Sequence, residues 1–107
     1  MTRLLINPGA CGMLVQVDVE QKDNKTFSLT VTSECTMVQK LGTTLTELTT
    51  MDAFKQLVEN PVFIKGAACL KHAACPVPCG ILKALEVEAG LNVPRDVTMS
   101  FVKDTAG

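Results

Sequence analysis

The sequence contains no tryptophan and no tyrosine, and only four phenylalanines. Any core must therefore be built mainly from aliphatic side chains, and an apolar fraction of 47% is ordinary for a globular chain. An excess of charge of either sign is also absent, since the net charge is -1 and both signs are interspersed. This mixed surface gives no reason to expect a nucleic acid or a membrane as partner.

Long apolar runs are missing as well. Residues 1–6 are too short an apolar segment for a signal peptide, and no run approaches the length of a membrane span. We therefore expect a cytoplasmic protein whose thiols are kept reduced. The chain also lacks a phosphate-binding glycine loop, a Gly-x-Ser-x-Gly motif and paired carboxylates. With no internal repeat or linker, its length predicts a single domain over residues 1–107.

Two segments alternate between apolar and polar residues, which predicts half-buried strands over residues 13–20 and 26–33. The turn chemistry of residues 22–24 joins them into a hairpin. Three helices are expected: one over residues 36–41 that stops at Gly42, one from Thr49 or Thr50 to residue 60, and one over residues 76–89. Residues 62–71 are ambiguous between a helix and irregular structure. Residues 96–103 alternate between apolar and polar residues and are expected to form a closing strand. The prediction is an α+β fold, a small mostly antiparallel sheet of order ββααα then β with helices on one face.

Within the second helix, Phe54, Leu57 and Val58 are expected to face inward. The hairpin register can also be predicted, because residues directly opposite each other share a face. A three-residue turn would pair Val15 with Val31.

The same register would set Cys11 opposite Cys35 at the open end of the hairpin, on its buried side. Cross-strand Cβ atoms lie about 4.5–5.5 Å apart, so two such thiols could share a metal. The alternative is that both are small core side chains.

Five cysteines are many for so short a chain, and in a reducing compartment clustered cysteines indicate metal or redox chemistry before disulfides. Residues 69–79 have the spacing Cys-x2-His-x2-Cys-x3-Cys, which matches the bacterial ferredoxin run with histidine in place of the second cysteine. Proline follows the third ligand rather than the last, and a second run is missing. We therefore predict no ferredoxin, but four soft or borderline ligands lie close together: Cys69, His72, Cys75 and Cys79.

Cys75 is the strongest candidate of this segment. Pro76 and Pro78 suit the first turn of a helix, so Cys75 is predicted as its N-cap, where backbone amides and the helix dipole favour a thiolate. His72, three residues earlier, is a candidate ligand. Burial would explain Cys69 nearly as well as ligation, and for Cys79 we favour a core position.

Residues 8–12, 32–35, 72–78 and 86–91 together resemble a small cysteine-containing family of anaerobic bacteria and archaea with no assigned activity, over nearly the whole chain. The resemblance implies that Cys11, Cys35, His72 and Cys75 are signature residues. A fainter likeness is to the Thr-Ser-Cys-Pro-Thr domain attached to some ribonucleotide reductases, which is thought to bind metal. Here the Cys-Pro pair lacks the preceding serine and the following threonine.

The leading hypothesis is a binding or carrier protein for zinc or an iron–sulfur cluster, with Cys11, Cys35 and Cys75 as thiolate ligands and His72 or Cys69 as the fourth. A protein that donates or accepts the metal, and a homodimer, are both compatible with it. It requires the three sulfurs within about 4–6 Å of one another, and Cys75 away from the Asp23–Asn24 turn. Two alternatives stay open. One is a thiol redox or thiol-transfer enzyme with Cys75 as nucleophile and Cys11 or Cys35 as resolving thiol; the other is an interaction domain with core cysteines.

Overall fold

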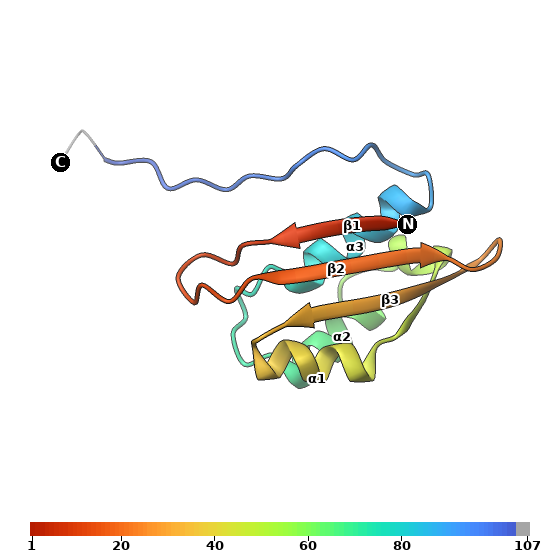
Figure 1. Cartoon of the computed structure of the whole chain (residues 1–107), viewed down its shortest axis with the longest axis horizontal. Helices are drawn as coiled ribbons and strands as arrows, with labels where there is room; N and C mark the ends of the chain where they lie inside the picture. The colour runs from red at the N-terminus through yellow and green to blue at the C-terminus, as the bar shows by residue number, and fades with distance from the viewer. Residues whose placement is uncertain (105–107) are drawn as a thin grey trace.

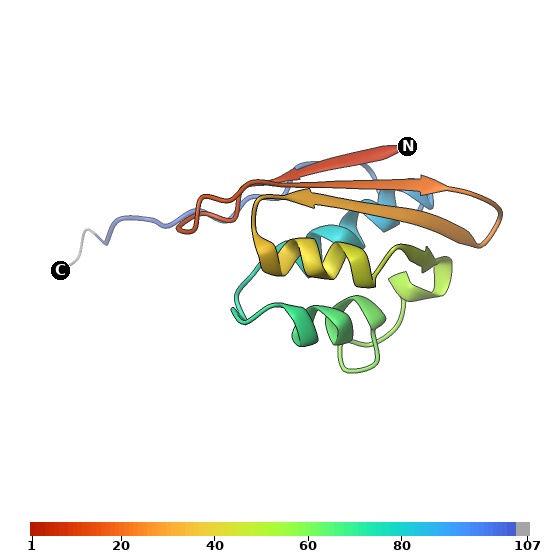
Figure 2. The ribbon, with the colours of Figure 1, turned by 60° about the horizontal axis from the view of Figure 1, so that its bottom comes forward.

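The computed structural model describes residues 1–104 and consists of a four-stranded antiparallel sheet with its helices against one face (Figures 1 and 2). The predicted α+β class is therefore confirmed. The strands lie in the order of the sequence: β1 (Thr2–Ile6), β2 (Val15–Gln21), β3 (Thr26–Ser33) and β4 (Glu47–Thr49).

The β2–β3 hairpin buries the face that its alternation predicts. The apolar side chains of both strands point toward the helices and form the centre of the core. At the turn, the Asp23 carboxylate accepts hydrogen bonds from the backbone of Lys25 and Thr26, both at 2.9 Å. The Lys22 N–H donates to the Thr26 carbonyl at 2.9 Å, which closes a three-residue turn over residues 23–25, one residue later in the chain than the predicted turn over residues 22–24.

Because the turn lies one residue later than predicted, the predicted register is wrong by two residues. Val17 pairs with Val31, and Val15 pairs with Ser33. A shift of two residues keeps the same side chains on the same face, so the buried face is right while the partners are not. The predicted pairing of Cys11 with Cys35 fails with the register.

β1 is an edge strand that the sequence did not reveal. It pairs with β2, from Thr2 opposite Val19 to Ile6 opposite Val15. Its few residues end in three successive apolar side chains, so period-two alternation is hard to recognise there. Leu5 accordingly lies on the outer face and is 73% exposed.

Helix α1 (Thr36–Thr44) packs against β3 and extends beyond the stop predicted at Gly42. A Cβ atom on Gly42 would lie 3.1 Å from the carbonyl oxygen of Val31. This glycine therefore permits close approach between helix and strand rather than ending the helix.

The helix predicted from Thr49 or Thr50 to residue 60 is wrong. Only a 3-10 turn, η1 (Thr50–Ala53), forms there. The side chains of Phe54, Leu57 and Val58, expected to face inward, are exposed.

Asn60 is the physical reason for this difference. Its buried side-chain amide donates to the carbonyls of Asp52 at 2.7 Å and Lys55 at 3.2 Å, and its oxygen accepts from Val62 N–H at 3.0 Å. The side chain thus holds residues 54–59 as a loop and caps α2 (Pro61–Cys69), which settles the ambiguous segment as a helix.

Helix α3 (Val77–Glu88) is the clearest sequence prediction and lies across β1 and β2. Gly80 faces β1 so closely that any side chain there would overlap Ile6. The helix ends before Gly90, whose φ of 75° is suited to glycine.

The predicted closing strand over residues 96–103 is absent. Residues 92–104, which we call the tail, have no regular secondary structure, and all of their side chains are exposed. Figure 1 shows the tail leaving the end of α3 and extending past the sheet. Within the described part of the chain, no helix is long and apolar enough to cross a membrane.

Candidate functional site

Three cysteine-bearing segments lie at the same end of the sheet, which we call the cysteine end. They are the β1–β2 loop, the start of α1 and the α2–α3 loop, and both views place them opposite the β2–β3 turn (Figures 1 and 2). The prediction that the start of α3 lies away from the Asp23–Asn24 turn is therefore correct. The up-and-down topology of strand and helix is what brings residues far apart in sequence to this end.

Cys11 is exposed in the β1–β2 loop. It lies between Gly9 and Gly12, whose φ angles of 92° and 69° are in the left-handed region. The Gly12 N–H donates to the Gly9 carbonyl at 2.9 Å, and the Gly9 N–H donates to the Asn7 side chain at 3.1 Å. This tight turn presents Cys11 to solvent rather than to the buried side of the hairpin.

Cys35 is the N-cap of α1 and is half-buried against the core. Its N–H donates to Ser33 Oγ at 3.2 Å, and its carbonyl accepts from Gln39 at 2.9 Å. The thiol itself makes no capping hydrogen bond, and the first turn of α1 contains no acidic residue. The amide donors and positive dipole end of the helix therefore stay available beside the sulfur.

Cys75 is also half-buried against the core, in a turn directly before α3. Its N–H donates to the His72 carbonyl at 3.1 Å. The predicted N-cap role is wrong by one residue. Pro76 is the N-cap, because the first helical hydrogen bond runs from Gly80 to the Pro76 carbonyl, at 3.0 Å. His72, at the start of the same turn, is exposed.

The other two cysteines differ in their surroundings. Cys69 ends α2 inside the hydrophobic core and is 8% exposed. Cys79 is exposed in the first turn of α3, contrary to the core position we favoured for it. Cys69 thus has the surroundings of a packing residue, and Cys79 those of a surface residue.

Ser33 and Met37 connect the segments of the cysteine end, although neither was predicted as a site residue. Ser33 Oγ donates to the Leu14 carbonyl at 2.9 Å while accepting the Cys35 N–H, so it joins the β1–β2 loop to α1. The Lys71 N–H donates to Met37 Sδ at 3.5 Å, which joins the α2–α3 loop to the same helix. Each cysteine segment is therefore attached to α1 or to its N-terminus.

The predicted ligand cluster is not assembled in this conformation. Across residues 1–104, no three or more His, Cys, Asp or Glu side chains are grouped so that they could hold a metal ion. The register shift explains part of this, because the β2–β3 ladder ends at Val15 and Ser33 and leaves Cys11 in the loop beyond it.

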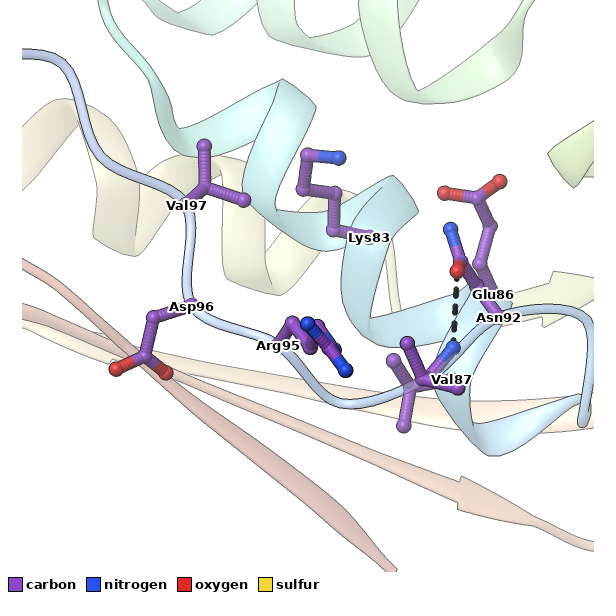
Figure 3. Close-up of a pocket in the computed structure, with 8 residues that line it drawn as sticks. Lys83, Glu86, Val87, Asn92, Arg95, Asp96 and Val97 are labelled. Atoms are coloured by element: carbon purple, nitrogen blue, oxygen red, sulfur yellow. Dashed lines mark hydrogen bonds between the residues drawn. The ribbon is translucent and has the colours of Figure 1, made fainter.

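A groove of about 260 Å³ lies away from the cysteine end, between the outer side of α3 and the tail (Figure 3). Lys83, Glu86 and Val87 of α3 form one wall. The tail forms the other wall up to Val97, and there the Val93 N–H donates to the Asn92 side chain at 2.9 Å.

A family model matches residues 2–101 and describes a family of unknown function, DUF6951. The chain belongs to this family. Neither curated proteins nor solved structures give a match. The matched region covers the three cysteine segments and the tail up to residue 101.

Proposed function

We propose that this DUF6951 protein binds a zinc ion or an iron–sulfur cluster through Cys11, Cys35 and Cys75 and acts as a carrier for it. The observation that supports the proposal is the gathering of three cysteine segments at one end of the sheet (Figure 2). Thiolates select these metal centres over the hard cations. His72 is the preferred fourth ligand, because it is exposed in the turn that holds Cys75, whereas Cys69 would have to leave the core.

In this proposal, metal binding closes the site. Cys35 and Cys75 sit at the rim of the core, and Cys11 is carried by an exposed loop with two left-handed glycines. Movement of that loop would bring the third thiolate to the other two, and the binding free energy would offset the cost of ordering it. A site that forms only around its metal suits a protein that must also release it.

Two helix N-termini lie at the cysteine end, beside the proposed ligands. The helices α1 and α3 both begin there, and neither has an acidic residue in its first turn. In this proposal, the partial positive charge at these two helix N-termini would stabilise the thiolate ligands of the bound metal.

The experiment is anaerobic purification followed by metal analysis and a visible spectrum, then reconstitution with zinc or with iron and sulfide. We expect stoichiometric metal, lost in each of the variants C11A, C35A and C75A. The matched control is C79A, because Cys79 is exposed on α3 but lies outside the proposed ligand set. A preparation without stoichiometric zinc or iron after reconstitution contradicts the proposal, and equal metal loss in C79A contradicts the assignment of ligands.

Alkylation by iodoacetamide separates the two alternatives if metal is absent. A thiol-transfer enzyme with Cys75 as nucleophile would have one thiol that reacts much faster than the other four. Uniformly slow alkylation of all five thiols would favour the other alternative, an interaction domain with core cysteines. In that case each single cysteine variant should lower the free energy of unfolding only by the cost of lost packing, about 1–2 kcal/mol.

A further inference from the structure

The tail has the pattern of a strand but no sheet around it. Val97, Met99 and Phe101 alternate with polar residues, yet Met99 and Phe101 are 86% and 109% exposed. Backbone hydrogen bonds from residues 97–103 to β1 are absent from the described chain. The family match extends to residue 101 and so covers Val97, Met99 and Phe101.

The sheet offers a place for a further strand along β1. β1 is the first strand in the sheet order, and its neighbour on one side is β2. On its inner face, Leu4 and Ile6 lie against Gly80 of α3. A strand added at this edge would place alternate side chains beside Leu4 and Ile6, over the outer flank of α3.

The tail cannot fill this place well in its own chain. Val97 lies level with Lys83 of α3 (Figure 3). Lys83 is about one helical turn closer to the C-terminus of α3 than Gly80, the residue at which the helix meets β1. From Val97 the tail runs in the direction of β1, and both views show it continuing past the end of the sheet. Residues 98–103 span about 20 Å when extended, whereas the part of β1 from Leu4 to Ile6 spans about 7 Å. Most of the apolar stretch therefore overshoots its own β1.

We propose that residues 97–103 of one copy add as a fifth strand to β1 of a second copy, and that the exchange is reciprocal. Each chain carries one such tail and one β1 edge, so a twofold arrangement satisfies both at once. Val97, Met99 and Phe101 then lie on the face of Leu4 and Ile6 and extend the core sideways. The backbone groups of both strands gain ladder partners.

The charges at both strands are compatible with this pairing. Residues 97–102 contain no charged side chain, and the one charged side chain of the proposed strand is Lys103 at its end. On β1 the charged side chain is that of Arg3, and its guanidinium is paired with Asp18 at 2.7 Å. Because Arg3 is neutralised by Asp18 and Lys103 stands at the end of the strand, the apolar part of the tail meets no unpaired charge on the described part of β1.

The experiment is sedimentation equilibrium of the full chain with a thiol reductant present, because five free cysteines could otherwise cross-link copies. We expect a dimer of the 11.5 kDa chain. F101D and M99D should each raise the dimer dissociation constant at least about tenfold, since each places a charge where a large apolar side chain is buried. S100D carries the same charge on the opposite face of the tail and should stay dimeric. Unchanged far-UV circular dichroism would show that each variant is folded.

Hydrogen exchange identifies the surface. Protection of the β1 amides should be present in the wild-type dimer and lost in F101D. A wild-type chain that is monomeric at about 100 μM overturns the proposal, whether its tail folds onto its own β1 or waits for a different protein. A dimer that survives both F101D and M99D, with β1 exchange unchanged, also overturns it, because the interface then lies elsewhere. None of these outcomes depends on metal binding at the cysteine end.

Discussion

The β2–β3 hairpin and the tail carry the same alternation of apolar and polar residues, but their surroundings differ completely. Val17 and Val19 are fully buried, whereas Met99 and Phe101 are almost fully exposed. The hairpin strands have each other as ladder partners and the helices as a cover. The tail lies beside α3 at its start and then has neither.

The difference shows that alternation selects a face without supplying a partner. A turn of a few residues returns β3 to β2, so the chain itself provides the ladder. The tail instead follows a helix and leaves in the direction of β1, with Pro94 lacking an N–H to donate. A strand that pairs with the tail is therefore not supplied by the neighbouring part of the chain. In our proposal it is β1 of a second copy.

The largest expected change in stability comes from a substitution in the β2–β3 hairpin. Phe27 is 1% exposed in β3, and F27A should lower the free energy of unfolding by about 3–5 kcal/mol because it leaves a cavity in the core. Urea unfolding followed by circular dichroism measures this, since the chain has no tryptophan to report by fluorescence. That is a large share of the roughly 5–15 kcal/mol typical of a domain, so F27A could be mostly unfolded. A loss below about 1 kcal/mol would mean that the hairpin face is not the core.

Residues 54–59 lie between the two extremes, because their apolar side chains are exposed but their backbone is held by Asn60. N60A should cost about 1–3 kcal/mol, since it removes the cap of α2 and leaves the carbonyls of Asp52 and Lys55 without their donor. Urea unfolding again measures the effect. The exposed Asn92 provides the matched control, and N92A should change stability by less than about 0.5 kcal/mol. Equal losses in the two variants would contradict the role of Asn60.

The same contrast explains how much of the molecule could be predicted from sequence. Where a side chain's environment is set by neighbours in the chain, the prediction holds: the faces of the hairpin, the helix around Ile81 and Leu85, and the glycine that follows it. Where a contact with a residue far away in the sequence sets the environment of a side chain, the prediction fails. Gly42 was predicted as a stop, but its contact with Val31 gives it a packing role.

The candidate site follows the same rule. The sequence marked Cys11, Cys35 and Cys75 because their types and local contexts suit thiolate chemistry, and the fold gathers their segments. The pairing of Cys11 with Cys35 depended on the hairpin register, which is set by hydrogen bonds at the Asp23 turn rather than by the apolar pattern. The roles of Ser33 and Met37 lie in contacts that no local motif encodes.

A smaller, pH-dependent effect is expected where the tail leaves the folded part of the chain. The Glu88 carboxylate accepts hydrogen bonds from Thr2 at 2.7 Å and Gln21 at 3.0 Å, 3.6 Å from the N-terminal ammonium. Partial burial raises its pKa, but these partners together lower the pKa below the ordinary value of 4.5.

Because the folded-state pKa is depressed, the stabilisation by Glu88 is fully present above about pH 5 and is lost as the pH falls through the folded pKa. Stability measured from about pH 6 to pH 3 should therefore fall more steeply in the wild type than in E88Q. T2V, which removes one of the donors, should reduce the same slope. Identical slopes in the wild type and E88Q would contradict the coupling of α3 to the start of β1.

The smallest expected change in stability comes from a substitution in the tail. In a dilute sample, where the chain is monomeric, F101A should change the free energy of unfolding by less than about 0.5 kcal/mol, because Phe101 contacts little of its own chain. In a concentrated sample the wild type should gain stability through association, and F101A should gain less. V102A, on the opposite face of the tail, should follow the wild type at both concentrations. If F101A instead costs more than about 1 kcal/mol in the dilute chain, the tail packs on its own sheet, and the hairpin and the tail differ less than their exposures indicate.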